Sequence, residues 1–256
     1  MKYILCIGCC IISCLLTIGS AAQSLKPDSS IHLYLLIGQS NMAGRGKPDA
    51  QSKMVNAKIL MLDSTNNWVP ATDPVHFDKP KVAGVGPAIS FANEMLGKNK
   101  NITIGLIPCA WGGSPIKVWS PGATYFNAHP YDDAVRRTKI AMQKGVLKGI
   151  IWHQGEADND SLKYKKYLPE LVLLVQRFRK DLSNDALPFV AGEIGYFNKR
   201  NFINAVINQL PRELPYTSVV TAKDLADKGD HLHFDAPSAR ELGKRYARAM
   251  KLLQEQ

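Results

Sequence analysis

The feature that most constrains the fold is the alternation, after residue 30, of short apolar runs with helical patterns. The apolar runs lack strict polar alternation, which is typical of strands buried on both faces of a parallel sheet. Strand and helix in regular succession predict an α/β fold in which right-handed crossovers place helices on both sides of that sheet. The expected strands are residues 31–37, 102–107, 149–152, 189–194 and 217–221, and the expected helices are 87–96, 132–143, 164–182, 202–210 and 238–253.

The first 22 residues have the layout of a secretory signal peptide. Lys2 supplies a positive charge, residues 4–18 are mostly apolar, and residues 19–22 are small. The apolar run is short for a membrane span, so cleavage after Ala22 is expected to leave a secreted or periplasmic chain with no membrane span. Lipid anchoring through Cys14 fits less well, because Ile12 stands where a small residue is usual.

The rest of the chain, residues 23–256, is expected to form one domain, since no repeat or second boundary interrupts its pattern. Signal cleavage would remove four of the five cysteines and leave Cys109 alone, so no internal disulfide is expected. The formal net charge is +10, but the basic residues are scattered and no basic stripe is interleaved with aromatic residues. The sequence therefore does not predict nucleic-acid binding, and it leaves the oligomeric state open.

One long segment, residues 45–86, breaks the alternation of strands and helices. It is rich in Pro, Asp, Asn and Lys, and it contains an expected hairpin over residues 57–71 with turn residues at 63–67. Because it follows the first strand, it lies at the carboxyl edge of the sheet, where open α/β folds bind ligands. Long inserted loops are usually functional or disordered, and Trp68, His76 and Phe77 argue against disorder here.

Four segments with reactive side chains lie at the expected carboxyl edge. The first strand ends on Gly38-Gln39-Ser40-Asn41, and the other segments read CAWGGSPIKVW (109–119), WHQGEAD (152–158) and DKGDHLHFD (227–235). The carboxyl ends of parallel strands meet in space, so these segments are expected to converge. Asp230 precedes His233 by three residues, which lets its carboxylate reach Nδ1 of His233 while Nε2 faces Ser40.

These residue types suit a serine hydrolase. A serine hydroxyl needs a base to take its proton, and histidine is the suitable base near neutral pH. The developing oxyanion needs hydrogen-bond donors. The expected donors are the backbone N–H of Ser40, a backbone N–H of Gly112 or Gly113, and the side-chain amide of Gln154. Such a mechanism requires no metal or organic cofactor.

Each segment also has a structural interpretation. Ser40 alone could cap a helix, and Gly112-Gly113 could be only a turn. Glu156 could be a helix-start acid that interacts with the dipole. His231, His233 and Asp235 could suggest a metal site, which would need His153 or Glu156 as a further ligand. The joint occurrence of all four segments in this order is much more specific than any one of them.

The segments LLIGQSNMAGRG, PCAWGGSPI, WHQGEAD and DHLHFD resemble the SGNH-type esterases. Within these the chain resembles the sialate O-acetylesterase and acetyl xylan esterase group, carbohydrate esterase family six, over nearly its whole mature length. The resemblance implies a flavodoxin-like three-layer α/β/α sandwich and removal of acetyl groups from sugar hydroxyls. It implies Ser40 as the nucleophile, His233 as the base and Asp230 as its orienter. Gln154 stands where the general SGNH pattern has an oxyanion-binding asparagine.

Gln39, Asn41 and Glu156 are expected to have supporting roles. Glu156 could hold a loop or the edge of the site, or act as a second acid near His233. Trp111, Trp119 and His76 are candidates for a substrate rim, because aromatic rings pack against sugar faces, although such rings also dominate cores. The expected substrate is an acetylated carbohydrate, either xylan-type or O-acetyl sialic acid. Two other functions remain open: another serine esterase or lipase-like hydrolase on this scaffold, and a sugar-binding protein without catalysis.

Overall fold

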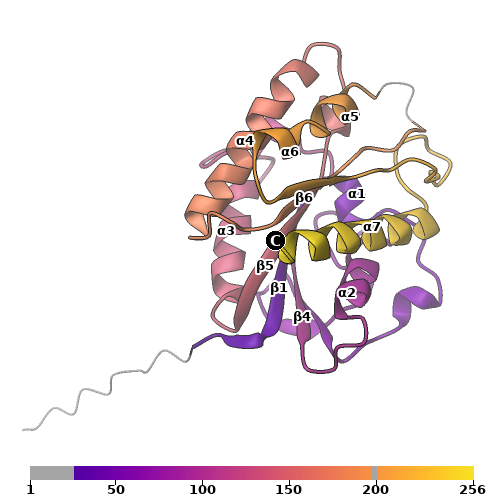
Figure 1. Cartoon of the computed structure of the whole chain (residues 1–256). Helices are drawn as coiled ribbons and strands as arrows, with labels where there is room; N and C mark the ends of the chain where they lie inside the picture. The colour runs from indigo at the N-terminus through magenta and orange to yellow at the C-terminus, as the bar shows by residue number, and fades with distance from the viewer. Residues whose placement is uncertain (1–25, 198–200) are drawn as a thin grey trace, which may run out of the picture.

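The computed structural model describes residues 26–197 and 201–256, so the expected signal peptide lies outside the described residues. A seven-stranded sheet with the order β3-β2-β4-β1-β5-β6-β7 forms the centre of the molecule (Figure 1). Every neighbouring pair is parallel except β2 and β3. The strands are β1 (Asp28–Gly38), β2 (Ile59–Leu62), β3 (Trp68–Pro70), β4 (Thr103–Pro108), β5 (Gly145–His153), β6 (Phe189–Gly192) and β7 (Thr217–Val220).

The middle strand β1 shows why the apolar runs lack polar alternation. Successive side chains of a strand point to opposite faces of the sheet. Tyr34 and Leu36 belong to the core on one face, whereas Leu33, Leu35 and Ile37 belong to the core on the other. All five side chains are fully buried. A strand with a core on each side must be apolar at every position, and this confirms the expected doubly covered sheet.

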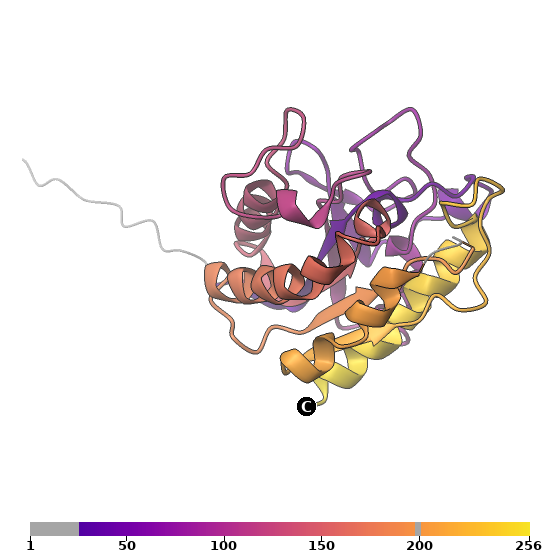
Figure 2. The ribbon, with the colours of Figure 1, turned by 90° about the horizontal axis from the view of Figure 1, so that it is seen from above.

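Two layers of helices provide these cores (Figure 1 and Figure 2). The face of Tyr34 packs against α2 and α7, and Tyr34 meets Phe91 of α2 edge to face with ring centroids 5.0 Å apart. The opposite face packs against α3, α4, α5 and α6. The resulting three-layer α/β/α sandwich confirms the predicted fold class. The helices are α1 (Ser40–Ala43), α2 (Ala88–Leu96), α3 (Pro130–Ala141), α4 (Tyr164–Asp181), α5 (Phe202–Ile207), α6 (Leu210–Glu213) and α7 (Ala236–Gln254).

Two differences from the expected elements have local causes. The helix expected over 202–210 ends at Ile207 and a new short helix begins at Leu210. Pro211 has no N–H group and its ring crowds the carbonyl oxygen of Ile207, four residues earlier, which favours a break at this point. The hairpin expected over 57–71 is present, but it also extends the sheet, because β2 pairs in parallel with β4.

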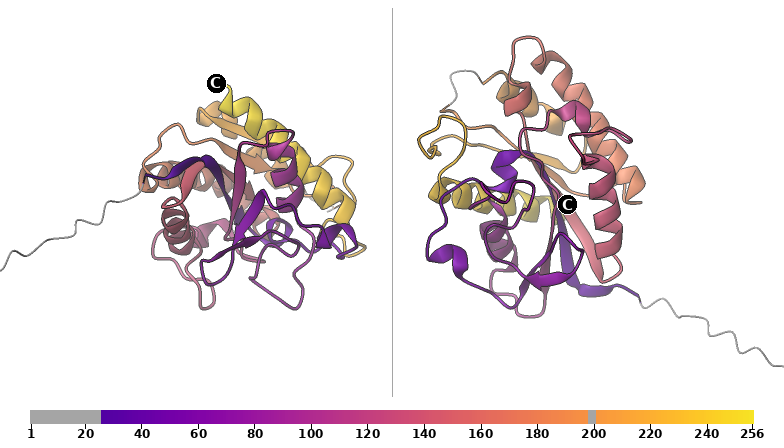
Figure 3. Two further views of the ribbon diagram at one scale, coloured as in Figure 1. Left: turned by 90° about the horizontal axis from the view of Figure 1, so that it is seen from below. Right: turned by 180° about the vertical axis from the view of Figure 1, so that it is seen from behind.

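The hairpin turn is held by Asp63, whose Oδ1 accepts the N–H groups of Thr65 and Asn67. Asn66 has a φ of +66°, a conformation that asparagine tolerates better than most residues. The segment between α1 and α2, purple in the right panel of Figure 3, carries this hairpin and a short 3₁₀ helix, η1 (Gln51–Lys53). Within the described residues no helix is both long and apolar enough to cross a membrane.

Candidate active site

The candidate nucleophile stands where β1 turns into α1. Gly38, the last residue of β1, has a φ of +130°, and a Cβ atom on it would lie 2.1 Å from the carbonyl oxygen of His153. Only glycine permits this close approach of β1 to β5. The next N–H group, that of Gln39, donates to the same carbonyl at 2.9 Å. Ser40 is therefore presented at the carboxyl edge of the sheet with its backbone fixed on the N-terminal side.

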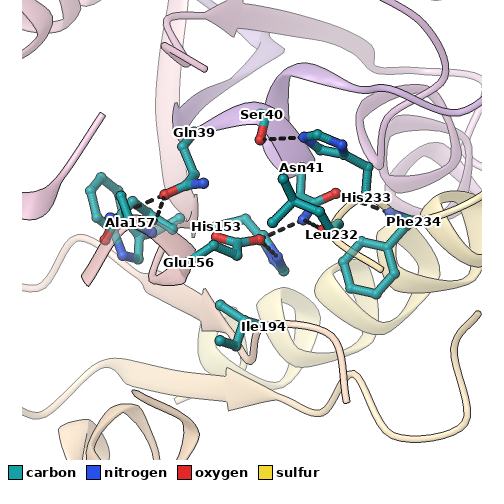
Figure 4. Close-up of polar contacts among 12 residues, drawn as sticks. Gln39, Ser40, Asn41, His153, Glu156, Ala157, Ile194, Leu232, His233 and Phe234 are labelled. Carbon is teal, nitrogen blue, oxygen red and sulfur yellow. Dashed lines mark hydrogen bonds and ion pairs between the residues drawn. The ribbon is translucent and has the colours of Figure 1, made fainter. Parts of the chain in front are cut away.

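Ser40, His233 and Asp230 form a continuous hydrogen-bonded chain. Figure 4 shows its first link, from Ser40 to the ring of His233. His233 Nε2 lies 3.0 Å from Ser40 Oγ, and His233 Nδ1 lies 2.7 Å from Asp230 Oδ2. A carboxylate can only accept, so Nδ1 carries the proton and Nε2 is left to accept the serine proton. The three side chains predicted from sequence thus stand in the order required of nucleophile, base and orienting acid.

The loop between β7 and α7 holds Asp230 in place for this role. Asp230 Oδ1 accepts the backbone N–H groups of Leu232 and His233 at 3.0 and 2.8 Å. Partial burial raises the pKa of Asp230, but the hydrogen bonds from the His233 ring and from these two N–H groups outweigh it and hold the pKa below its ordinary value. Asp230 is therefore ionised across the neutral range and can stabilise a charged imidazole.

Asn41 joins the nucleophile helix to the loop that carries the base. Its Nδ2 donates to Leu232 O at 3.1 Å and to Glu156 Oε1, and its Oδ1 accepts the N–H of Phe234 at 3.1 Å. Leu232 and Phe234 are the two neighbours of His233, so Asn41 fixes the backbone on both sides of the base. Asn41, for which a supporting role was expected, thereby positions His233 relative to Ser40.

Glu156 lies beneath Asn41 in a buried position, and its side chain is 4% exposed. Burial raises the pKa of Glu156 to about 7, although the hydrogen bond from Asn41 lowers it in part. His153 Nε2 lies 3.8 Å from Glu156 Oε1, while His153 Nδ1 pairs with Tyr246 Oη at 2.9 Å. Burial lowers the pKa of His153 to about 3, so its ring is neutral near pH 7. The hydrogen-bond partners of the His233 ring are Ser40 and Asp230, and Glu156 and His153 lie behind them as supporting groups.

The two glycines after β4 differ in the use of their backbone N–H groups. The N–H of Gly112 donates to Asp78 Oδ2 at 2.8 Å, so it is not available to a ligand. Gly113 is in the left-handed region with a φ of +83° and lines the cleft beside Ser40. Of the two alternatives drawn from sequence, the geometry therefore favours Gly113 as the oxyanion donor and disfavours Gly112.

Gln154 does not occupy the position expected of an oxyanion donor. Its side chain is fully buried, and its Nε2 already donates to Asp158 Oδ2 at 2.6 Å, Ser114 O at 3.1 Å and Gln39 Oε1 at 3.2 Å. With three acceptors around it, this amide nitrogen is committed within the protein. The expectation that Gln154 binds the oxyanion is corrected to a supporting role: it links the segment after β5 to the segments after β4 and β1.

The catalytic atoms open into a cleft of about 550 Å³. Its lining comes from the nucleophile turn, the glycine pair, the segment after β5, the loop before α7 and the long segment after α1. The lining residues are Gln39, Ser40, Arg45, Lys79, Val82, Gly112, Gly113, Glu156, Ala157, Lys228, Asp230, Leu232 and His233. The four segments that were expected to converge do so, and the long segment 45–86 contributes one wall.

The three aromatic candidates for a substrate rim do not line this cleft. Trp119 is 1% exposed, its Nε1 donates to Ser114 Oγ at 3.0 Å, and its ring packs edge to face on Trp152. Trp119 is therefore a core residue, as the alternative interpretation had it. His76 and Trp111 line a separate cavity of about 130 Å³, and burial lowers the pKa of His76 to about 4.

The histidines of the last loop serve different purposes. His231 is exposed and lies beside Asp227, whereas His233 faces Ser40. Asp235 caps α7 by accepting the N–H of Ser238 at 2.8 Å. Within residues 26–197 and 201–256, no group of three or more His, Cys, Asp or Glu side chains is arranged to hold a metal ion.

Asp78 is a site residue that the sequence analysis did not single out. Its Oδ2 accepts a hydrogen bond from the N–H of Gly112 and forms an ion pair with Arg45 at 2.8 Å. The side chains of Arg45 and Asp78 are both nearly inaccessible to solvent. The pair fastens the long segment after α1 to the glycine pair 34 residues further along the chain. A contact between distant segments leaves no local pattern in the sequence. The only signal for Asp78 was its place in the long segment at the carboxyl edge of the sheet.

Comparison with known proteins gives consistent results. The chain matches the family model described as "Carbohydrate esterase, sialic acid-specific acetylesterase" over residues 30–252. It is 34% identical over 250 residues to a probable carbohydrate esterase of Arabidopsis thaliana, a match that covers 89% of this chain and 92% of that protein. The residues matched by the family model include all three members of the hydrogen-bonded chain.

Solved structures share the fold. An X-ray structure of an Arabidopsis thaliana protein superposes with a TM-score of 0.78 at 32% identity, covering 86% of this chain and 98% of that one. A carbohydrate acetylesterase from Xanthomonas citri superposes with a TM-score of 0.69 at 20% identity, covering 87% of this chain and 56% of that one. At that identity the second likeness concerns the fold alone. The chain therefore belongs to the family of carbohydrate esterases described as sialic acid-specific acetylesterases, and it is an ester-hydrolysing enzyme.

Proposed function

We propose that this protein is a secreted or periplasmic carbohydrate O-acetylesterase that works through an acetyl-enzyme intermediate on Ser40. The observation that carries this proposal is the unbroken chain from Ser40 Oγ through both ring nitrogens of His233 to Asp230, at the floor of an open cleft. The assignment of an acetylated sugar as the substrate is supported by family membership. The proposed order of proton transfer is supported by the hydrogen bonds of His233.

In the first half of the reaction, His233 Nε2 takes the proton of Ser40 as Oγ bonds to the acetyl carbonyl carbon. The carbonyl electron pair moves onto oxygen, where the N–H groups of Ser40 and Gly113 stabilise it. The intermediate then collapses, the bond from carbonyl carbon to sugar oxygen breaks, and that oxygen leaves with the proton held by His233.

In the second half, water attacks the acetyl carbon and gives a proton to His233. Collapse of this second intermediate breaks the ester bond to Ser40, and Oγ recovers the proton from His233 as acetate leaves. Asp230 stays ionised throughout and stabilises the imidazolium in both halves. The proton that leaves with the sugar oxygen is replaced by the proton from water, so His233 and Ser40 return to their starting states.

The charges of the cleft favour an acidic sugar over a neutral one. Arg45 is paired with Asp78, and Lys228 lies 3.5 Å from Asp230. Lys79, in contrast, is exposed at the rim. A carboxylate on the substrate would gain from this cation, so we propose O-acetylated sialic acid ahead of acetylated xylan as the substrate class.

The test is acetate release from O-acetylated sialic acid, acetylated xylan and 4-nitrophenyl esters of increasing acyl length. The mature chain should release acetate and prefer the shortest acyl group, and Lys79→Ala should weaken turnover of the sialic acid substrate only. A preference for long acyl chains would indicate a lipase-like enzyme. A folded chain that binds sugar but releases no acetate would indicate a binding protein and overturn the proposal.

A further inference from the structure

A second depression lies beside the catalytic cleft and has a volume of about 440 Å³. Two residues, Gly113 and Ala157, line both spaces. Gly113 belongs to the turn after β4, and Ala157 follows Glu156 in the segment after β5. Because the two spaces share these walls, a ligand whose reacting group lies at Ser40 can extend from the cleft into the depression.

Three exposed lysines surround this depression, which we call the basic pocket. Lys117 lies in the 3₁₀ helix η2 (Ile116–Val118), and Lys163 and Lys166 lie at the start of α4. Within the described residues, no carboxylate is in salt-bridge contact with any of the three ammonium groups. The lining residues of the basic pocket are Gly113, Pro115, Lys117, Ala157, Asp158, Lys163, Lys166 and Glu170.

The two acids of the lining oppose this positive charge only in part. Asp158 is 6% exposed, and its Oδ2 accepts the N–H of Ile116 at 2.8 Å and Gln154 Nε2 at 2.6 Å. This carboxylate is therefore committed within the protein. Burial and the charge of Asp158 raise the pKa of Glu170, which keeps its proton to a higher pH than an ordinary glutamate. Three cations thus face two acids, and the lining carries a net positive charge.

The two lysines of α4 do not stand where the helix itself would favour them. Lys163 immediately precedes the helix, Lys166 lies in its first turn, and that turn contains no acidic residue. Positive charge near the N-terminus of a helix interacts unfavourably with the helix dipole. The stability of α4 therefore does not explain these lysines, whereas an anion bound between them and Lys117 would be stabilised by all three charges.

We propose that the basic pocket is a second sugar subsite, which binds a carboxylate-bearing residue next to the acetylated one. The acetylated residue occupies the cleft at Ser40, and its neighbour lies beyond Gly113 and Ala157 among the lysines. This inference rests on the proposed function and narrows its substrate class: acetylated acidic oligosaccharides are preferred over free acidic monosaccharides. A neutral chain such as xylan gains nothing from the lysines.

The test compares wild type with the double variant Lys117→Ala, Lys166→Ala. The substrates are O-acetylated sialic acid, a disaccharide of two sialic acids with the acetyl group on one residue, and acetylated xylobiose. An exposed ion pair changes affinity by no more than a few-fold. The double variant should therefore raise KM for the acidic disaccharide by about three- to ten-fold at low salt, with kcat and the other two substrates unchanged. High salt should reduce the difference.

The matched control is Lys98→Ala, Lys100→Ala. It removes the same charge at exposed positions between α2 and β4, at the opposite edge of the sheet, and should behave as wild type. Circular dichroism and thermal melting establish that each variant is folded. Titration calorimetry of the unacetylated acidic disaccharide into Ser40→Ala, with and without the two pocket lysines, gives the same comparison without turnover. Weaker binding after loss of the lysines is expected.

Three results would overturn the inference. An unchanged KM for the acidic disaccharide would show that the pocket does not bind it. An equal rise for the monosaccharide would assign the lysines to the acetylated residue itself, and an equal rise for xylobiose would show that charge is not recognised. In each case acetate release by wild type, and its loss in Ser40→Ala, would leave the proposed function intact. If wild type released no acetate, the proposed function would fall, and the calorimetric comparison would still decide the subsite.

Discussion

Asn41 and Glu156 lie 115 residues apart in the sequence, and the side-chain amide of Asn41 donates directly to the carboxyl group of Glu156. The same amide hydrogen-bonds the backbone on both sides of His233, because its nitrogen donates to Leu232 O and its oxygen accepts the N–H of Phe234. The buried carboxyl group thus orients the amide, and the amide orients the loop that carries the base.

Replacing Asn41 with alanine should lower both stability and turnover. The change removes three hydrogen bonds and leaves the buried Glu156 carboxyl group and the Phe234 N–H without their partner. We expect a loss of about 2–4 kcal/mol in the free energy of unfolding and a lower kcat because His233 is no longer held. Chemical denaturation and steady-state kinetics measure the two effects. Asn101→Ala, at an exposed position, is the control, and equal behaviour of the two variants would refute the role given to Asn41.

Glu156→Gln should change how stability depends on pH. The pKa of Glu156 is raised to about 7 in the folded protein, from an ordinary value of 4.5. Between these values the folded protein keeps a proton that the unfolded chain has released, so the free energy of unfolding falls as pH rises. Glu156→Gln lacks this contribution, which is on the order of 3 kcal/mol. Relative to the variant, the wild type should therefore lose stability between about pH 4.5 and about pH 7. Parallel stability profiles of the two proteins would contradict the raised pKa.

Asp78→Ala should destabilise the protein and slow catalysis together. It leaves the buried guanidinium of Arg45 uncompensated and releases the N–H of Gly112. Breaking a buried ion pair on one side typically costs about 3–5 kcal/mol. The Gly112–Gly113 turn would also lose its anchor, so kcat should fall. Asp78→Asn, which keeps an acceptor for Gly112, should recover more of kcat than of stability. If both variants had the wild-type kcat, Asp78 would not be anchoring the oxyanion turn.

Trp119→Phe tests the assignment of Trp119 to the core. The variant keeps an aromatic ring beside Trp152 but loses the Nε1 hydrogen bond to Ser114. We expect the free energy of unfolding to fall by about 1–3 kcal/mol with KM for the acetylated sugar unchanged. A sugar-contacting tryptophan would give the reverse result, a raised KM at unchanged thermal stability.

The features predicted well from sequence are those encoded locally. Each strand and helix has its own apolar period, and the order of elements dictates which ends meet at one edge. The pairing of His233 with Asp230 depends on a spacing of three residues within one loop, and the meeting of His233 with Ser40 follows from the parallel sheet. The interruption at Pro211 and the turn at Asp63 are also local chemistry, although the first was not anticipated.

The features that sequence did not predict depend on direction or on distant contacts. Gln154 follows the last residue of β5, and side chains one residue apart at a strand point to opposite sides. The sequence pattern therefore does not show that Gln154 turns toward Asp158 and away from the cleft. The contact of Asp78 with Gly112 spans 34 residues and has no local signature. Trp119 and Trp111 are chemically identical side chains. Trp119 is buried in the core and Trp111 lines a cavity, and this difference comes only from their surroundings in the fold.

Locating the nucleophile tests the proposed roles of Ser40 and His233 in a single experiment. The mature wild-type protein is treated with a fluorophosphonate, digested, and its labelled peptide is identified by mass spectrometry, with His233→Ala treated in parallel. We expect one label, on Ser40, and much slower labelling in the variant because the serine has lost its base. A label on another residue, or equally fast labelling of Ser40 without His233, would contradict the hydrogen-bonded chain as the source of activity.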